Sequence, residues 1–253
     1  MTYAPILPTR GHSSLNYFVI TPDNWVDNAL PHFDAAIVRP LITPRARKAN
    51  FAQYIFDLEP SGGTSRHIGA GFEHFLYQLE GEVVVETRER VEKLAPGDFC
   101  FFPAGSVFGV KNTGSERTRT FWTKRRYEAA DDLPSPEEIF GTQAAVPTIV
   151  PDPPAAYVYQ ELIPSINRSH DMAMNILSCR PGGSLGLVEI HHQEHGLLML
   201  SGRGIYYLAG EPHEVCKGDF IYMAPYCPQS FWATGEETAS YLLYKDVNRD
   251  GFS

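Results

Sequence analysis

Short apolar runs of four to six residues, bounded by turn residues, follow one another along this chain. Gln53–Leu58 and Met174–Cys179 each run into a turn rich in proline and glycine. Val83–Thr87 and Ile205–Leu208 each follow a glycine and end at a two-residue turn, which is typical of β-hairpins. No segment keeps the 3.6-residue period of a long helix, so the pattern predicts an all-β fold.

The chain contains an internal repeat at a constant offset of 121 residues. Glu73-His74 matches Glu194-His195, and Gly97-Asp98-Phe99 matches Gly218-Asp219-Phe220. The correspondence needs no gap over residues 60–124, so it indicates two copies of one structural unit. Each copy holds about a hundred residues of short strands, a size that suits a small barrel or sandwich.

A proline-rich segment separates the two copies, and so many prolines do not fit inside a sheet. The prolines are Pro134, Pro136, Pro147, Pro151, Pro153 and Pro154. We therefore predict a first unit with an N-terminal arm at residues 1–130, a linker or crossing arm at 131–160, and a second unit at 161–253. Within the linker, residues 135–138 (SPEE) fit the start of one short helix.

Composition narrows the classes of partner. The net charge is −9 and no basic run stands out, which argues against nucleic acid and anionic membranes as partners. No apolar run approaches the ~20 residues of a membrane span, and the first residues do not have the pattern of a secretory signal. The four cysteines show no CxxC pair or framework spacing, which predicts reduced thiols in a cytoplasmic protein.

The densest group of metal-capable side chains lies in the second unit. Glu189 and His191 are two residues apart, so in a strand they face the same side. His195 follows after a short turn, and Gln229 comes thirty-four residues later, past a hairpin. If the sheet closes into a barrel, these four side chains converge in its interior. Two imidazoles, one carboxylate and one amide oxygen suit a borderline-to-hard divalent ion and leave open positions, as in a catalytic site.

Both units resemble the cupin family. In the first unit, Gly97, Pro103, Gly105 and Asn112 fit the second motif of that family. Its four metal-ligand positions are occupied by Ile68, Ala70, His74 and Phe108. Since three of these positions carry no ligand, the resemblance implies a metal-free, structural first barrel in which His74 has a structural role.

The ligand positions of the second unit depart from the usual three histidines and one glutamate. Glutamate and histidine exchange places, and Gln229 replaces the last histidine. This set resembles the (S)-ureidoglycine aminohydrolases, manganese bicupins that release ammonia from (S)-ureidoglycine to give (S)-ureidoglycolate in purine breakdown. The segments HDMAMNILSCRPGG, EIHHQEHG, LSGRGIYYL and YKDVNRD, together with HFLYQLEGEV and TKRRY in the first unit, extend the resemblance over nearly the whole chain. It implies Mn²⁺ bound by Glu189, His191, His195 and Gln229.

The resemblance also implies that the substrate contacts Glu189, Gln229, Tyr241 and Lys245. Tyr241 and Lys245 are four residues apart and share one side of a strand. Lys245 either holds the substrate carboxylate as a fixed cation or shuttles a proton. Glu189 either accepts a proton from water or only holds the metal. Glu189 and Lys245 are thus the two candidate catalytic residues.

Three alternatives stay open. A bicupin oxygenase or decarboxylase requires the usual ligand set, and a non-enzymatic cupin that binds a small molecule predicts ligands lost from both units. A sugar isomerase is excluded least well. We further expect His192 to point outward, Glu194 to share a structural role with Glu73, and Tyr206 to line the pocket. Exposed strand edges favour a homo-oligomer.

Overall fold

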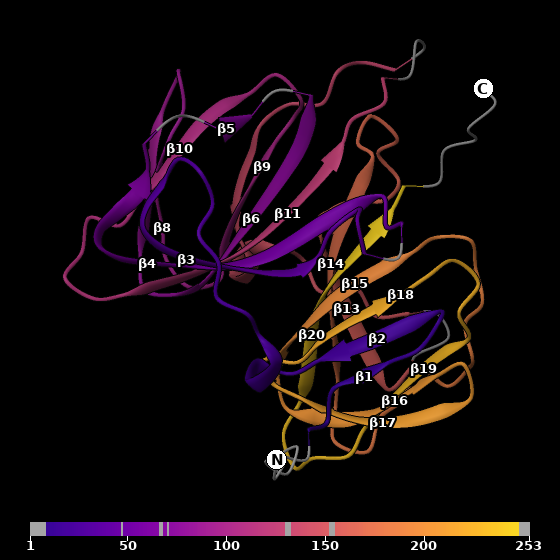
Figure 1. The fold of residues 1–253 in the computed structure, drawn as a ribbon. Coiled ribbons are helices and arrows are strands. Elements are labelled where there is room, and N and C mark those ends of the chain that lie inside the picture. Colours follow the sequence, from indigo (N-terminus) through magenta and orange to yellow (C-terminus); the bar gives the residue numbers. More distant parts are fainter. Residues whose placement is uncertain are drawn as a thin grey trace, which may run out of the picture.

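A computed structural model describes residues 9–46, 48–65, 68–69, 71–129, 133–151 and 155–247. Ala70, one of the first barrel's ligand positions, therefore lies outside the described residues. The described chain is built from strands, with two short 3-10 helices, η1 (Pro22–Asn24) and η2 (Gln143–Ala145). Neither helix is long or apolar enough to cross a membrane. The structure has two curled bodies of β-sheet that lie side by side (Figure 1).

The first body is a single ten-stranded sheet, with the order β12-β9-β6-β11-β4-β10-β7-β8, and with β3 on β4 and β5 on β10. Its strands are β3 (Phe33–Ile42), β4 (Phe51–Thr64), β5 (Ile68–Gly69), β6 (Phe72–Glu80), β7 (Val83–Glu86), β8 (Val91–Leu94), β9 (Asp98–Phe102), β10 (Val107–Lys111), β11 (Thr118–Arg126) and β12 (Ile139–Thr142). All pairs are antiparallel, which allows the short turns expected from the sequence.

The second body packs a three-stranded sheet, β17-β16-β19, with a seven-stranded sheet of order β1-β2-β18-β15-β20-β14-β13. Its strands are β1 (His12–Ser13), β2 (Tyr17–Ile20), β13 (Tyr157–Ile163), β14 (Met172–Cys179), β15 (His195–Ser201), β16 (Arg203–Leu208), β17 (Glu211–Cys216), β18 (Phe220–Met223), β19 (Gln229–Ala233) and β20 (Ala239–Asp246). A buried apolar cluster with Leu197, Tyr206, Phe231 and Tyr241 joins the two sheets.

Each half of the chain lends strands to the other barrel: β1 and β2 join the second barrel, and β12 joins the first. β2 pairs with β18 of the second barrel, with Phe18 opposite Tyr222 (Figure 1). β12 pairs with β9 of the first barrel, with Ile139 opposite Phe101. The repeat offset of 121 residues relates Phe18 to Ile139 and Phe101 to Tyr222. The two exchanged strands therefore occupy equivalent positions, and the exchange is pseudo-symmetric.

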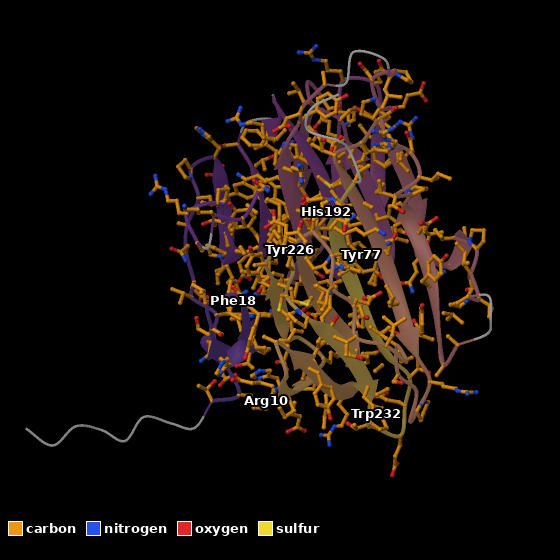
Figure 2. The ribbon with its side chains drawn as sticks, turned by 90° about the vertical axis from the view of Figure 1, so that its right-hand side faces the viewer. Arg10, Phe18, Tyr77, His192, Tyr226 and Trp232 are labelled. Carbon is orange, nitrogen blue, oxygen red and sulfur yellow. The ribbon has the colours of Figure 1, made fainter. Side chains whose placement is uncertain are left out.

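This exchange means that strand pairing crosses the predicted boundaries at residues 130 and 160. The N-terminal arm adds to the second barrel, where Arg10, labelled in Figure 2, forms an ion pair with the buried Asp219. The proline-rich segment is a crossing arm that carries β12. The short helix predicted at residues 135–138 is wrong, because this stretch is irregular and leads directly into β12. A residue before proline avoids helical angles, and both Pro134 and Pro136 impose that restriction here.

Two buried glutamates hold the barrels together in the same reciprocal way. The Asn50 backbone N–H donates to Glu194 Oε1 at 2.7 Å, and the Asp171 backbone N–H donates to Glu73 Oε2 at 2.9 Å. Each glutamate thus satisfies a backbone group at the start of a strand in the other barrel. The structural role that we predicted for both residues is confirmed.

An apolar interface surrounds these hydrogen bonds. Phe51 of the first barrel stacks on Tyr244 of the second, with 4.0 Å between ring centroids. Gly196 is required at this contact, since a Cβ there would lie 2.1 Å from Gln53 Oε1 and 2.6 Å from the Phe51 ring. The close approach fixes β15, which starts at the candidate ligand His195, against the first barrel.

Candidate metal centre in the second barrel

A pocket of about 370 Å³ opens into the second barrel. Its lining consists of Tyr157, Tyr159, Glu161, Ser165, Asn175, Leu177, Glu189, His191, Gln193, His195, Leu243 and Lys245. Four residues singled out from the sequence, Glu189, His191, His195 and Lys245, therefore share one cavity. Gln229 and Tyr241 are buried and contribute no surface to it.

The two histidines face each other through ring nitrogens that carry lone pairs. His195 Nδ1 lies 3.0 Å from the Tyr244 carbonyl oxygen and His191 Nδ1 lies 3.2 Å from that of Gln193. A carbonyl accepts only, so each Nδ1 holds the proton and each Nε2 is left as an acceptor. These two Nε2 atoms are 3.1 Å apart. Two acceptors at this distance suit a shared cation, so the histidines fit a metal site.

Burial keeps His195 in the form that binds metal. Desolvation lowers the pKa of His195 to about 3, with further lowering by the neighbouring His191 and Lys245. The imidazole is therefore neutral over the physiological range.

Gln229 completes the convergence through its amide. Gln229 Nε2 lies 3.1 Å from His191 Nε2, and the Tyr206 hydroxyl donates to Gln229 Oε1 at 3.3 Å. Rotating the amide by 180° presents its oxygen to the imidazoles and its NH₂ to the Tyr206 oxygen, so the side chain fits a ligand role. Tyr206, which we expected to line the pocket, is instead buried behind Gln229.

Glu189 lies in the segment between β14 and β15 and is held against Gln229 by two backbone hydrogen bonds. The Glu189 N–H donates to the Gln229 carbonyl at 2.8 Å, and the Gln229 N–H donates back at 3.0 Å. This is an isolated bridge and not the longer strand that we expected around Glu189 and His191. Both side chains nevertheless line the same pocket.

The last strand, β20, places Lys245 beside His195 and Tyr241 farther along the same face. Lys245 is the cross-strand neighbour of His195, and Tyr241 that of Met199. Burial raises the pKa of Tyr241 well above its usual value, and the Tyr206 hydroxyl and the Glu189 charge add to this effect. Tyr241 reaches the site through Tyr206 and Gln229, whereas Lys245 reaches the cavity itself.

Several polar residues of the lining were not singled out from the sequence, and two of them lie opposite each other on neighbouring strands. Glu161 on β13 and Asn175 on β14 are cross-strand neighbours, and both enter the pocket. Neither belongs to a cupin motif, and Glu161 precedes the second copy of the repeat, so no local pattern marks them. His192, by contrast, is exposed as expected; it is one of the labelled residues in Figure 2.

The corresponding region of the first barrel is filled with aromatic side chains. His74 is buried, accepts a hydrogen bond from Trp122 Nε1 at 3.1 Å, and packs edge-on against Phe108 with ring centroids 5.2 Å apart. Burial lowers the pKa of His74 to about 3, and nearby Lys124 contributes to the shift. These contacts account for His74 as part of the packing, in the role predicted for it.

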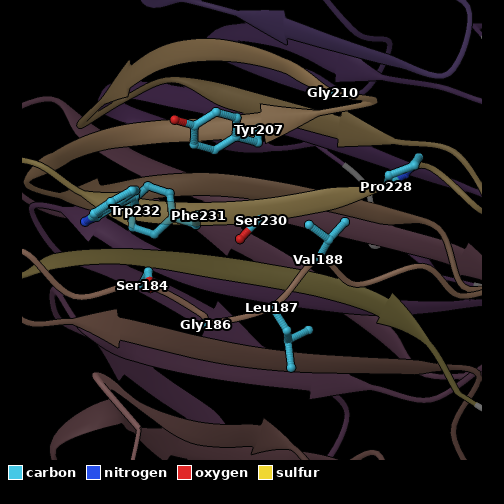
Figure 3. A pocket seen from close by; sticks show the side chains of 10 residues that line it. All are labelled: Ser184, Gly186, Leu187, Val188, Tyr207, Gly210, Pro228, Ser230, Phe231 and Trp232. Carbon is cyan, nitrogen blue, oxygen red and sulfur yellow. The ribbon is translucent and has the colours of Figure 1, made fainter.

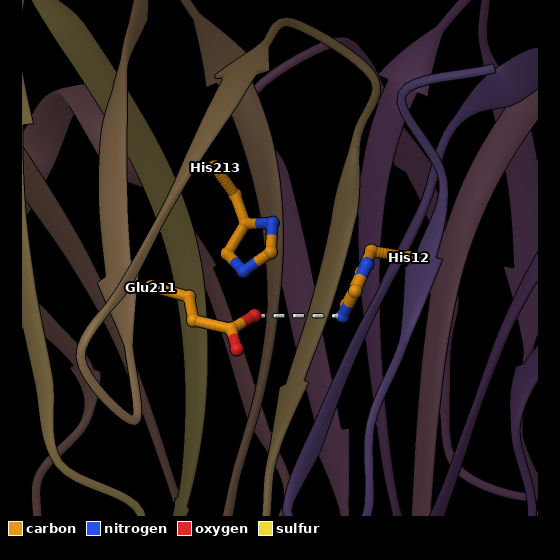
Figure 4. Close-up of side chains that lie close together, drawn as sticks. All are labelled: His12, Glu211 and His213. Carbon is orange, nitrogen blue, oxygen red and sulfur yellow. Dashed lines mark ion pairs between the residues drawn. The ribbon is translucent and has the colours of Figure 1, made fainter. Parts of the chain in front are cut away.

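A second group of metal-capable side chains lies where the N-terminal arm meets β17. The ligand atoms of His12, Glu211 and His213 all lie within 4.8 Å of one another (Figure 4). The Tyr17 hydroxyl donates to Glu211 Oε2 at 2.8 Å and lies 3.0 Å from His213 Nε2. About two hundred residues separate His12 from the other two, so no local pattern predicts this group. It is a surface cluster, since His12 and Glu211 are exposed.

Comparison with known proteins identifies both barrels. The family model described as Cupin domain matches residues 54–124 and 175–244. The (S)-ureidoglycine aminohydrolase of Escherichia coli (strain K12) is 33% identical over 237 residues, which cover 93% of this chain and 90% of that protein. The (S)-ureidoglycine aminohydrolase of Arabidopsis thaliana is 30% identical over 96% of this chain and 79% of that protein.

Solved structures agree with these matches. Protein Ylba from E. coli superposes with a TM-score of 0.86 at 32% identity, covering 96% of each chain. Fold and matches together define a bicupin, a protein with two cupin barrels in one chain, as the sequence predicted. The chain belongs to the (S)-ureidoglycine aminohydrolase family. An oxalate decarboxylase at 10% identity and a TM-score of 0.72 shares the fold alone.

Proposed function

We propose that this chain is a metal-dependent hydrolase that converts (S)-ureidoglycine and water to (S)-ureidoglycolate and ammonia in purine breakdown. The observation that carries the proposal is the pair of facing imidazole Nε2 atoms, 3.1 Å apart, in a cavity that also holds Glu189 and Lys245. The two relatives described above, which bear that activity in their names, support the choice of reaction.

The reaction is a replacement at one carbon. Water supplies the oxygen that bonds to the carbon, the C–N bond to the amine breaks, and one water proton leaves with the amine as ammonia. The ureido nitrogen assists, because its lone pair stabilises the electron-poor carbon as the amine departs. A protein that performs this reaction must orient the substrate so that water attacks one face only.

Glu189, His191, His195 and Gln229 are the residues that would hold the cation, which we propose to be Mn²⁺. A bound divalent ion supplies Lewis acidity at the reacting carbon's substituents. Lys245 provides a cation on the cavity wall for the substrate carboxylate. Glu189 provides a carboxylate for a proton of the attacking water or for the metal. Tyr241 acts through the Tyr206 hydroxyl, which orients the Gln229 amide.

The direct test is ammonia release. We expect the purified protein, loaded with Mn²⁺, to release one ammonia per molecule of freshly prepared (S)-ureidoglycine and to form the (S) product, measured by coupled ammonia detection and chiral chromatography. The metal-stripped protein should be inactive and should recover on adding Mn²⁺. Equal rates with and without metal, or no ammonia from the loaded protein, would contradict the proposal.

A homo-oligomer is the assembly that we propose. A groove of about 480 Å³ on the second barrel, shown in Figure 3, is lined mainly by apolar residues and glycine. Leu187, Val188 and Trp232 there are 56%, 62% and 51% exposed, and such contiguous apolar surface is typical of protein contacts. We expect light scattering to give a mass of two or more times the 28.3 kDa of one chain. Trp232→Glu should lower the measured mass toward that of one chain. A wild-type monomer would contradict this assembly.

A cytoplasmic location also stays a prediction.

A further inference from the structure

We propose that Asn175 and Glu161 form a subsite that accepts hydrogen bonds from the N–H groups of a planar urea-type substituent, and that this subsite selects the ureido end of the substrate. The inference takes the identity of the substrate from the proposed function, but the residues that carry it are different ones. Neither Asn175 nor Glu161 belongs to the candidate metal ligands or to the residues expected to hold the carboxylate.

The primary observation is an unsatisfied acceptor. Asn175 is only 5% exposed, and its side-chain Oδ1 atom has no hydrogen-bond partner among the described residues. Asn175 lines the candidate pocket, and its Oδ1, which has almost no accessible surface as placed, turns toward the cavity when the amide is rotated by 180°. A buried polar atom without a partner is costly and rare in native proteins, so such an atom beside an open cavity indicates a group that arrives with the ligand.

Glu161 adds a second acceptor on the same face. It lies directly opposite Asn175 in the β13–β14 pair, and directly opposite residues of antiparallel strands point to the same side of the sheet. The Ser165 hydroxyl donates to Glu161 Oε1 at 3.3 Å, which restrains the carboxylate. The pair therefore presents acceptors, which match two N–H groups on one edge of a ureido substituent.

The charges on the cavity wall fix the orientation of the substrate. Lys245 lies on β20 beside His195, while Asn175 on β14 pairs with Leu243 of the same strand. A substrate that carries a carboxylate at one end and a ureido group at the other gains from placing the carboxylate at Lys245. The reverse orientation would bring two carboxylates together at Glu161, which is unfavourable. The carbon between the two ends then lies toward the imidazoles.

Two stable compounds test the subsite without turnover. Ureidoacetate has the carboxylate and the ureido group but no amine to release, and N-acetylglycine replaces the terminal NH₂ by a methyl group. We expect the Mn²⁺-loaded wild type to bind ureidoacetate at least about tenfold more tightly in calorimetry, because a site that accepts N–H bonds rejects an analogue without them. Asn175→Leu, of similar size, should weaken ureidoacetate about tenfold and leave N-acetylglycine within about twofold.

Matched variants separate recognition from folding. Asn175→Ser keeps an acceptor oxygen without adding a charge opposite Glu161 and should retain the preference for ureidoacetate, and Glu161→Gln should reduce it severalfold. Melting temperatures establish that each variant is folded. If folded Asn175→Leu binds both compounds as the wild type does, or weakens both equally, the subsite is wrong. If the preference disappears as expected but the wild type releases no ammonia from (S)-ureidoglycine, the subsite stands and the proposed reaction is wrong.

Discussion

His195→Ala is expected to abolish tight Mn²⁺ binding and to lower kcat/KM for ammonia release by at least about a hundredfold. His195 is buried, and its Nε2 is one of the two lone pairs that face each other at the centre of the site. Removing the His195 side chain leaves His191 Nε2 without its counterpart. It also removes a neutral metal ligand whose orientation is held by the hydrogen bond from Nδ1 to the Tyr244 carbonyl. Calorimetric titration with Mn²⁺ and initial rates of ammonia release measure the two effects.

Two control variants locate the metal. His213→Ala removes a histidine from the surface cluster with His12 and Glu211, and His74→Ala removes the packed histidine of the first barrel. Both should bind one Mn²⁺ per chain in the second barrel and keep near wild-type kcat/KM. The assignment would be overturned if His213→Ala lost the metal while His195→Ala kept it, because the surface cluster would then be the binding site.

Asp57→Ala is expected to lower the free energy of unfolding by about 3–5 kcal/mol, the usual cost of removing one partner of a buried ion pair. Asp57 is 1% exposed on β4 and accepts hydrogen bonds from Arg39 Nη1 at 2.7 Å and from Arg119 Nε at 2.8 Å. Without the carboxylate, two guanidinium groups from the flanking strands lose their common counter-charge. The exposed pair of Glu59 with Arg117 is the control, and Glu59→Ala should cause only a small change. Urea unfolding measures both.

The same carboxylate gives the stability a definite pH dependence. Burial acts to raise the pKa of Asp57, but the hydrogen bonds from Arg119 and Arg39 outweigh it and hold the pKa below the usual value. The folded state therefore binds this proton less tightly than the unfolded state, so the contribution is fully present above the ordinary aspartate pKa of about 4. It is lost as the pH falls through the lowered folded value. The stability difference between wild type and Asp57→Asn should be constant from pH 6 to 8, because the carboxylate is ionised in both the folded and the unfolded state there, and it should shrink below about pH 4. A constant difference down to pH 2 would contradict this account.

The sequence was sufficient to predict the two-barrel fold because the relevant signals are local or repeated. The hairpin that turns at Gly210 and the strand after Gly218 are marked by turn residues, and the offset of 121 residues shows that the pattern occurs twice. The candidate site was predictable to the same extent. Glu189, His191 and His195 lie within seven residues, and the structure places all three in one cavity.

Features that depend on pairing between strands far apart in the sequence could not be predicted from local patterns. β2 is a four-residue apolar run, and nothing in it shows that its partner is Phe220–Met223. Proline density correctly argued against a sheet interior, but it concealed β12, which occupies the position next to β9 at the end of the strand order. Asn175 and Glu161 meet only because β13 pairs with β14, and the unsatisfied oxygen of Asn175 is a property of three-dimensional packing.

The crossed strands constrain how the chain can mature on the ribosome. β2 ends at Ile20, but the strand with which it pairs, β18, begins only at Phe220. The strand β2 therefore stays without its partner until about two hundred further residues have been synthesised. Such a late, long-range closure is slow, and it leaves a strand of one polypeptide free to insert into a neighbouring copy at high concentration.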